Sequence, residues 1–178
     1  MASTYIADKF DWEKDYPIEE LLQCVIAIKE FPNQLARILP SLSEEQLNAT
    51  YREGSWTVRQ IVHHLADAHM NAFLRCKHML SGDQPEIQPW NHENWATEMD
   101  YQFNHEASFM IILGVHQRWS LLMLECLKNP TEYLAKSMYH PQQKKHISLA
   151  QMMALYSWHG THHLHQIQFA IQSLNESL

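Results

Sequence analysis

The sequence predicts an all-α fold, a four-helix bundle in which long crossover connections join some of the helices. Two observations favour helix: only 4 glycines occur in 178 residues, and no stretch sustains the period-two alternation of a strand. A third is that apolar residues recur at steps of three and four in four long stretches, the spacing of one helix face. Such helices bury their apolar faces most economically in a bundle. The length suits a single domain, residues 1–178.

The first long helix is expected to begin after Pro17, because proline suits the first turn of a helix. Its apolar stripe consists of Leu21, Leu22, Val25 and Ile28. Pro32 has no backbone N–H, so we expect the helix to kink or restart there. Ser43 and Gln46 form a capping-box pattern that predicts a short helix before Tyr51.

The second long helix is expected to start at Thr57, which forms a capping box with Gln60. Its inward stripe should contain Ile61, His64 or Leu65, Ala68, Ala72, Arg75 or Cys76, and Met79. His64 falls within this stripe, whereas His63 should face outward or toward a rim. His64 is therefore the better ligand candidate of the pair.

A long connection, residues 81–104, follows this helix and contains two prolines and several aromatic residues. Connections of this length are unusual unless they pack or function, so we expect this one to cover the mouth of a pocket. The third long helix should run from about 104 to 128 and end at Asn129-Pro130. Its inward face should contain Phe109, Ile112, Val115 or His116, Trp119, Leu122 or Met123, and Cys126. Residues 129–147 should form a polar connection.

The last long helix is expected to begin near Leu149, after a capping box formed by Ser148 and Gln151. Its apolar stripe consists of Met152, Leu155 or Tyr156, His159, His163, Ile167, Ala170 and Leu174. Two histidines therefore occupy positions that belong to the core.

His159 and His163 are one helical turn apart, so their imidazoles can converge on one ion. Two buried imidazoles would repel each other when charged and need polar partners when neutral, and a shared cation removes both problems. His64, on another inward stripe, can supply a third nitrogen. Three histidine ligands leave coordination positions open, as in catalytic sites. A divalent ion held in this way can activate water or a thiol.

Two neighbouring side chains are candidates for supporting roles. His162 follows His159 by three residues and is either a rival ligand or a partner that holds a ligand imidazole. Asp67 lies one turn after His64 and either orients a ligand or bound water, or forms a solvated ion pair with a basic neighbour. His165 is expected at the surface.

Charge and composition exclude several classes of function. The formal charge is −7 and no dense run of basic residues occurs, so binding to nucleic acid or to an anionic membrane is not expected. The 3 cysteines are far apart, no signal peptide is evident, and the apolar run 109–115 is too short to span a bilayer. We therefore expect a cytoplasmic protein. Neither a phosphate-binding glycine loop nor a serine-hydrolase motif is present.

Two segments resemble the YfiT branch of the DinB superfamily: residues 54–71 (GSWTVRQIVHHLADAHMN) and residues 156–167 (YSWHGTHHLHQI). The likeness extends over nearly the whole chain, although Pro-Trp-Asn-His after Gln88 replaces a Pro-Tyr-Asp-like run. The resemblance implies a four-helix bundle, often a homodimer, with one divalent nickel or zinc ion per chain. It assigns the three metal ligands to His64, His159 and His163, the same residues that periodicity selects.

Three functional hypotheses follow from the residues and the resemblance. The first is a metal-dependent hydrolase in which the ion activates water for attack on a small substrate. The second is a metal-dependent S-transferase that uses a low-molecular-weight thiol, since relatives in the superfamily use bacillithiol or mycothiol. The third is a non-catalytic, metal-stabilised dimeric binding module.

Overall fold

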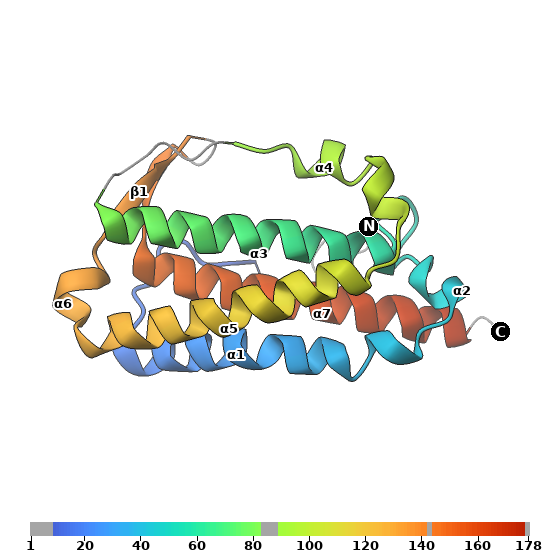
Figure 1. The fold of residues 1–178 in the computed structure, drawn as a ribbon, viewed down its shortest axis with the longest axis horizontal. Helices are drawn as coiled ribbons and strands as arrows, with labels where there is room; N and C mark the ends of the chain where they lie inside the picture. Colours follow the sequence, from blue (N-terminus) through green and yellow to red (C-terminus); the bar gives the residue numbers. More distant parts are fainter. Residues whose placement is uncertain (1–8, 83–88, 142–143, 177–178) are drawn as a thin grey trace.

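Four long helices carry the fold in the computed structural model, which describes residues 9–82, 89–141 and 144–176. They are α1 (Ile18–Ala36), α3 (Val58–Ser81), α5 (Glu106–Lys128) and α7 (Leu149–Glu176). α1 and α3 each pack against both α5 and α7. Figure 1 shows α1 and α7 running in one direction and α3 and α5 in the other. This arrangement confirms the predicted four-helix bundle.

All three predicted capping boxes are present at helix starts. In each box the Ser or Thr side chain accepts a hydrogen bond from the backbone N–H of the glutamine. The glutamine side chain accepts one from the backbone N–H of that Ser or Thr. They are Ser43 with Gln46 before α2 (Glu44–Leu47), Thr57 with Gln60 before α3, and Ser148 with Gln151 before α7. The sequence therefore defines where these helices begin.

The first helix does not restart at Pro32, which was one of the two outcomes expected from the sequence. α1 runs unbroken from Ile18 to Ala36. Phe31 and Leu35, on either side of the proline, are buried in the core. Their packing offsets the roughly 3 kcal/mol by which proline disfavours a helix interior. The backbone N–H that position 32 lacks is the one that would bond to the carbonyl of Ile28.

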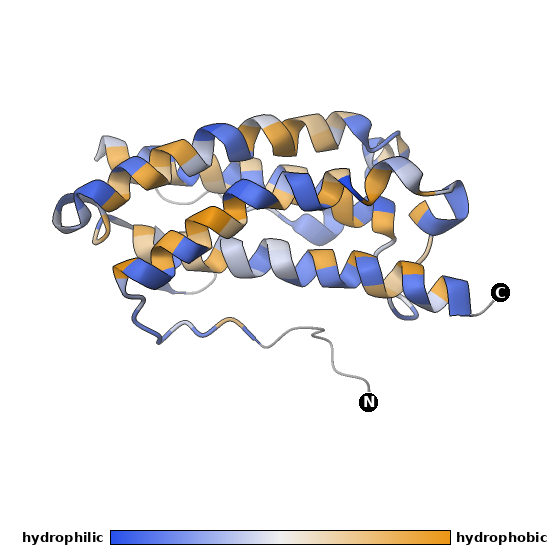
Figure 2. Cartoon of the chain, turned by 90° about the horizontal axis from the view of Figure 1, so that it is seen from below, coloured by the Kyte–Doolittle hydropathy of each residue, from blue (hydrophilic) through white to orange (hydrophobic). Residues whose placement is uncertain are grey.

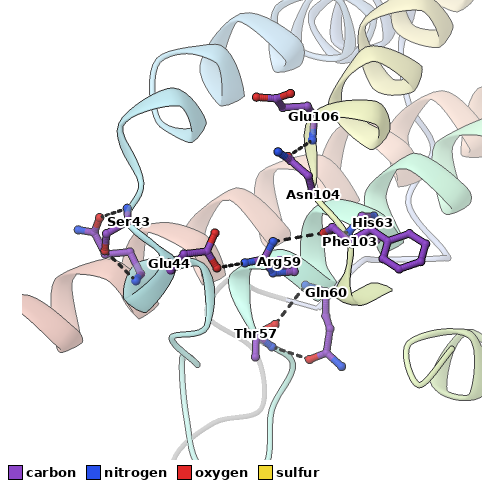
Figure 3. A network of polar contacts seen from close by, with 10 residues as sticks. Ser43, Glu44, Thr57, Arg59, Gln60, His63, Phe103, Asn104 and Glu106 are labelled. Atoms are coloured by element: carbon purple, nitrogen blue, oxygen red, sulfur yellow. Dashed lines mark hydrogen bonds and ion pairs between the residues drawn. The ribbon is translucent and has the colours of Figure 1, made fainter. Parts of the chain in front are cut away.

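Residues 89–105 of the crossover between α3 and α5 pass along the outside of α3 (Figure 1). Its described part contains the short helix α4 (His92–Trp95) and the 3-10 helix η2 (Met99–Gln102). Gln60 Nε2 donates to the carbonyl of Ala96 at 2.9 Å, and Arg59 donates to that of Phe103 at 3.2 Å. Figure 3 shows Arg59 lying between Phe103 and Glu44 of α2, with which it forms an ion pair. These contacts hold the crossover against the first half of α3.

The connection between α5 and α7 contains structure that the sequence did not predict. After the short helix α6 (Pro130–Tyr133), strands β1 (Ser137–His140) and β2 (Lys145–Ser148) pair antiparallel. Met138 lies opposite Ile147, and both are buried against the bundle. Strands of four residues are too short to show a sustained period-two pattern, so the expected polar connection is in fact a hairpin.

The core consists of two apolar clusters with buried histidines between them. One cluster contains Trp119 and Tyr156, and the other contains Phe31. The ring of His69 lies 5.4 Å from that of Tyr156, and the ring of His116 lies 5.3 Å from that of Phe31. A polar layer therefore crosses the middle of the bundle.

Helix α5 is apolar on more than its inward face. By length and composition alone it could cross a membrane, although core helices of soluble proteins meet the same criterion. Its inward face packs against α1 and α3, while Met110 and Leu121 are each 62% exposed. Seen from below, the helices carry hydrophobic residues interspersed with hydrophilic ones (Figure 2). Packing in the bundle accounts for the inward apolar residues but not for these outward ones.

Candidate metal centre

The structure brings together the three histidines that the sequence selected as ligands. His64 on α3 and His159 and His163 on α7 each offer a ring nitrogen, and these nitrogens lie within 4.8 Å of one another. The Nε2 atoms of His64 and His159 are 3.3 Å apart. Two imidazole nitrogens on one tetrahedral zinc ion, each about 2.0–2.1 Å from it, would lie about 3.3–3.4 Å apart. The residues present therefore fit a divalent ion.

Burial keeps the three imidazoles neutral. It lowers the pKa of His64 and of His159 well below the ordinary value, and the neighbouring His163 lowers both further. Burial, with His162 nearby, lowers the pKa of His163 to about 3. Only a neutral imidazole offers a lone pair to a metal, so all three are in the ligating form at neutral pH.

The outer nitrogen of His163 is held by Gln166, one turn along α7. His163 Nδ1 lies 2.7 Å from Gln166 Oε1, which can only accept, so Nδ1 carries the proton and Nε2 keeps its lone pair. The amide nitrogen of Gln166 donates to His162 Nε2 at 3.0 Å. Gln166 therefore bridges His163 and His162, whose ring centroids lie 5.3 Å apart. The sequence reasoning missed Gln166, although its position at i+3 from a proposed ligand is a usable signal.

The outer nitrogen of His159 meets another histidine, His69 of α3. His159 Nδ1 is 2.9 Å from His69 Nε2, and His69 Nδ1 is 2.6 Å from His116 Nε2 on α5. His116 Nδ1 in turn lies 2.6 Å from the backbone carbonyl of Ile28 on α1. His69 and His116 are both fully buried. Sequence reasoning assigned neither a role, although His69 follows Leu65 by four residues on the inward stripe.

His64 is held by aromatic packing. Its Nδ1 is buried and meets no hydrogen-bond partner within residues 9–82, 89–141 and 144–176. Its ring centroid lies 4.6 Å from that of Trp56, and the ring of Trp90 in the crossover stacks on it at 5.8 Å. Aromatic side chains thus hold His64 in place, whereas His159 and His163 are held by polar partners.

The prediction that His63 faces outward or toward a rim was wrong. Its side chain is buried, because the crossover and the start of α5 cover this face of α3. The hydroxyl of Ser108 donates to His63 Nδ1 at 2.7 Å, and His63 Nε2 donates to the carbonyl of Phe103 at 3.2 Å. His63 therefore connects α3 to the crossover and to α5 and is not part of the ligand cluster.

Asp67 lies against the crossover. The hydroxyl of Tyr101 donates to Asp67 Oδ2 at 2.6 Å, and burial raises the pKa of the carboxyl group. Tyr101 is itself buried, so the pair ties α3 to η2. His165, in contrast, is exposed on α7, as expected.

The ligand cluster opens into a cavity of about 420 Å³ with aromatic walls. The aromatic lining residues are Tyr51, Trp56, Trp90, Tyr156 and Trp158. Trp90 and His92 come from the crossover, in agreement with the prediction that this segment covers a pocket. Glu93 is the only aspartate, glutamate, lysine or arginine among the described lining residues. A larger cavity of about 500 Å³, beside Arg59 and His105, contains none of the three ligands.

Comparisons with known proteins agree with this geometry. A protein from Geobacillus thermodenitrificans named "Putative metal-dependent hydrolase" is 40% identical over 165 residues, which is 92% of this chain and 90% of that protein. One from Oceanobacillus iheyensis with the same description is 34% identical over 167 residues, covering 94% and 95%.

A solved structure shares the fold. YfiT from Bacillus subtilis, described as "a probable metal-dependent hydrolase with an unusual four-helix bundle topology", matches with a TM-score of 0.86 and 30% identity. The match covers 95% of this chain and 96% of YfiT. The model of the DinB superfamily matches residues 27–167, which include all three candidate ligands. The chain therefore belongs to the DinB superfamily.

Proposed function

We propose that the protein is a metal-dependent hydrolase in which His64, His159 and His163 hold one divalent ion. The observation that carries the proposal is that three neutral imidazoles converge at the base of an aromatic cavity. The names of the relatives support the same class of activity. Three nitrogen donors suit nickel or zinc, and they leave coordination positions open toward the cavity.

The bound ion supplies Lewis acidity and lowers the pKa of water or of a thiol. The chain's own residues present three lone pairs, fix the orientations of the rings and limit the access of solvent. Gln166 holds His163, and we propose that His162 acts by holding Gln166. We likewise propose that Asp67 acts at a distance, by fixing Tyr101 and with it the crossover above the cavity.

The lining of the cavity favours a small, uncharged and largely apolar or aromatic substrate. Five aromatic side chains form the walls, and no lysine or arginine is among the described lining residues. Arg52 lines an adjoining recess, where Glu93 is also present. A substrate with several negative charges would find little compensation here. This argues for hydrolysis of a neutral ester or amide over transfer of a thiol that carries carboxylates.

We also propose a homodimer located in the cytoplasm. Outward apolar side chains on α5, including Met110 and Leu121, provide surface that a second copy would cover. We propose that residues 1–178 act as one domain.

The proposed reaction can be tested with zinc-loaded and nickel-loaded protein. We expect metal-dependent hydrolysis of p-nitrophenyl acetate and much less of p-nitrophenyl phosphate, because no lysine or arginine is among the described residues that line the cavity. His159→Ala should lose this activity together with the metal, whereas His165→Ala, at an exposed position on the same helix, should retain both.

Two other outcomes would replace the proposal. Conjugation of monochlorobimane to added thiols, dependent on both metal and thiol and without ester hydrolysis, would establish the S-transferase. If His159→Ala loses the metal yet retains every cellular effect of the protein, a non-catalytic binding module is the correct description.

A further inference from the structure

A line of hydrogen-bonded groups links all four long helices behind one ligand. It starts at His159 on α7, passes through His69 on α3 and His116 on α5, and ends at the carbonyl of Ile28 on α1. The three distances are 2.9, 2.6 and 2.6 Å. We call these four groups the histidine relay. Each long helix contributes one member, so the relay is complete only when the bundle is assembled.

The end of the relay fixes every proton in it. A carbonyl oxygen can only accept, so His116 must carry its proton on Nδ1, which leaves Nε2 as an acceptor. His69 therefore donates from Nδ1 to His116 and accepts at Nε2. His159 then donates from Nδ1, and its Nε2 is left with a free lone pair on the side of His64. One backbone oxygen thus dictates the tautomer of a ligand three links away.

Pro32 explains why the Ile28 carbonyl is available. In a regular helix this oxygen would accept from the backbone N–H four residues later, which is position 32. Proline has no backbone N–H, and its ring crowds the carbonyl four residues before it, which here is that of Ile28. The side chain of His116 supplies the missing donor at 2.6 Å. The proline within α1 and the relay are therefore parts of one arrangement.

The surroundings of the relay exclude competing partners. His69 is 0% exposed and His116 is 1% exposed. The ring of Phe31 lies 5.6 Å from that of His69 and 5.3 Å from that of His116. Phe31 in turn packs against Gly160, next to His159, where a Cβ would come within 3.1 Å of its ring. A dry environment strengthens each hydrogen bond and makes an unpaired ring nitrogen costly.

We propose that His69 and His116 are positioning residues that hold His159 in its metal-ligating tautomer through the histidine relay. This inference rests on the proposed metal site and adds residues that never touch the ion. Because the relay ends on a carbonyl, which has no proton to exchange, it fixes orientation and does not conduct protons. Partners of this kind are typically worth about 10- to 100-fold in metal affinity.

The first test reads the tautomers directly in the full-length protein. Long-range ¹H–¹⁵N correlation spectra of histidine-labelled protein distinguish Nδ1–H from Nε2–H imidazoles, and single substitutions assign the signals. We expect His159, His69 and His116 all to be Nδ1–H, in both metal-free and zinc-loaded protein. An Nε2–H pattern at any of the three would overturn the relay.

The second test measures zinc affinity by competition with a chelator. His116→Leu should weaken binding about 10- to 100-fold, because His69 loses its acceptor. His116→Gln should restore most of the affinity, since its amide oxygen can accept where Nε2 now does. His165→Leu, at an exposed position, is the matched control and should bind as the wild type does. Equal affinities for the Leu and Gln variants, or wild-type affinity for both, would contradict the proposal.

These tests separate the relay from the proposed hydrolase. If the protein binds zinc but hydrolyses nothing, the affinity series and the spectra still decide the relay. If His116→Leu fails to fold, the tautomers of the wild-type protein decide it alone.

Discussion

At the scale of single residues, the three proposed ligands differ in how their outer nitrogens are held. His163 has a glutamine behind it, His159 has the histidine relay, and His64 has aromatic walls. Removing each kind of support should therefore have a different consequence. Loss of a polar partner frees a ring to change tautomer, whereas loss of a wall frees it to rotate.

Gln166→Leu should weaken zinc binding by about 10-fold or more, because the Nδ1 of His163 loses its acceptor. Chelator competition measures the effect. Gln168→Leu is the matched control, since Gln168 is exposed on the same helix and should bind zinc normally. Equal affinities for the two variants would show that Gln166 does not orient the ligand.

Gly160→Ala should lower both thermal stability and zinc affinity. The added Cβ would lie 3.1 Å from the ring of Phe31, which is buried and packs on His69 and His116. Overpacking of this kind costs about 1–3 kcal/mol, more than the gain in helix propensity of roughly 1 kcal/mol.

Gly114→Ala provides the control for this substitution. Nothing lies within 4 Å of a Cβ at this position in α5, so the change should stabilise the protein by about 0.5–1 kcal/mol and leave zinc binding unchanged. Calorimetric melting of both variants gives the comparison. A Gly160→Ala variant that melts above the wild type would contradict the account of packing at Phe31.

At the scale of elements, Pro32 destabilises α1 locally but leaves the Ile28 carbonyl free to accept from His116. Pro32→Ala should restore a backbone N–H that competes for the Ile28 carbonyl and should therefore weaken zinc binding several-fold. Thermal stability should not fall, since alanine is favoured over proline in a helix interior by about 3 kcal/mol. Opposite effects on the two properties, measured by chelator competition and by melting, would distinguish this mechanism from general damage. Unchanged zinc affinity would count against it.

The elements also show what a sequence can predict. Helix starts depend on residues three apart, so the capping boxes at Ser43, Thr57 and Ser148 predicted them correctly. His64, His159 and His163 could be selected because each interrupts the apolar stripe of its own helix. His69 and His116 acquire their roles only from contacts between helices, which join residues at least 47 positions apart in the sequence. Periodicity within one helix cannot reveal such contacts.

At the scale of the whole molecule, the buried histidines should make the metal-free protein sensitive to acid. Burial lowers the pKa of His116 to about 4 and of His163 to about 3, and it lowers the pKa of His69 well below its ordinary value. In the unfolded chain these groups titrate near the ordinary imidazole pKa of 6.5. Below that pH the unfolded state binds more protons than the native state, so stability falls as the pH falls.

Urea unfolding of metal-free protein should therefore give a stability that is nearly constant above about pH 6.5 and declines toward pH 4. Each such histidine contributes a slope of about 1.4 kcal/mol per pH unit in that window. His116→Leu should reduce the slope by about 1.4 kcal/mol per pH unit, which corresponds to one proton. A stability that rises on acidification from pH 6.5 would mean that these imidazoles are charged in the native state.

The central claim is that one divalent ion binds where His64, His159 and His163 meet. Its most direct test is the metal content of protein purified without chelators from cells supplied with zinc and nickel, compared with the His64→Ala, His159→Ala and His163→Ala variants. We expect about one zinc or nickel ion per wild-type chain and a large loss in each variant, because each removes one of three nitrogen ligands. Wild-type protein with almost no metal, or variants that retain a full equivalent, would contradict the account.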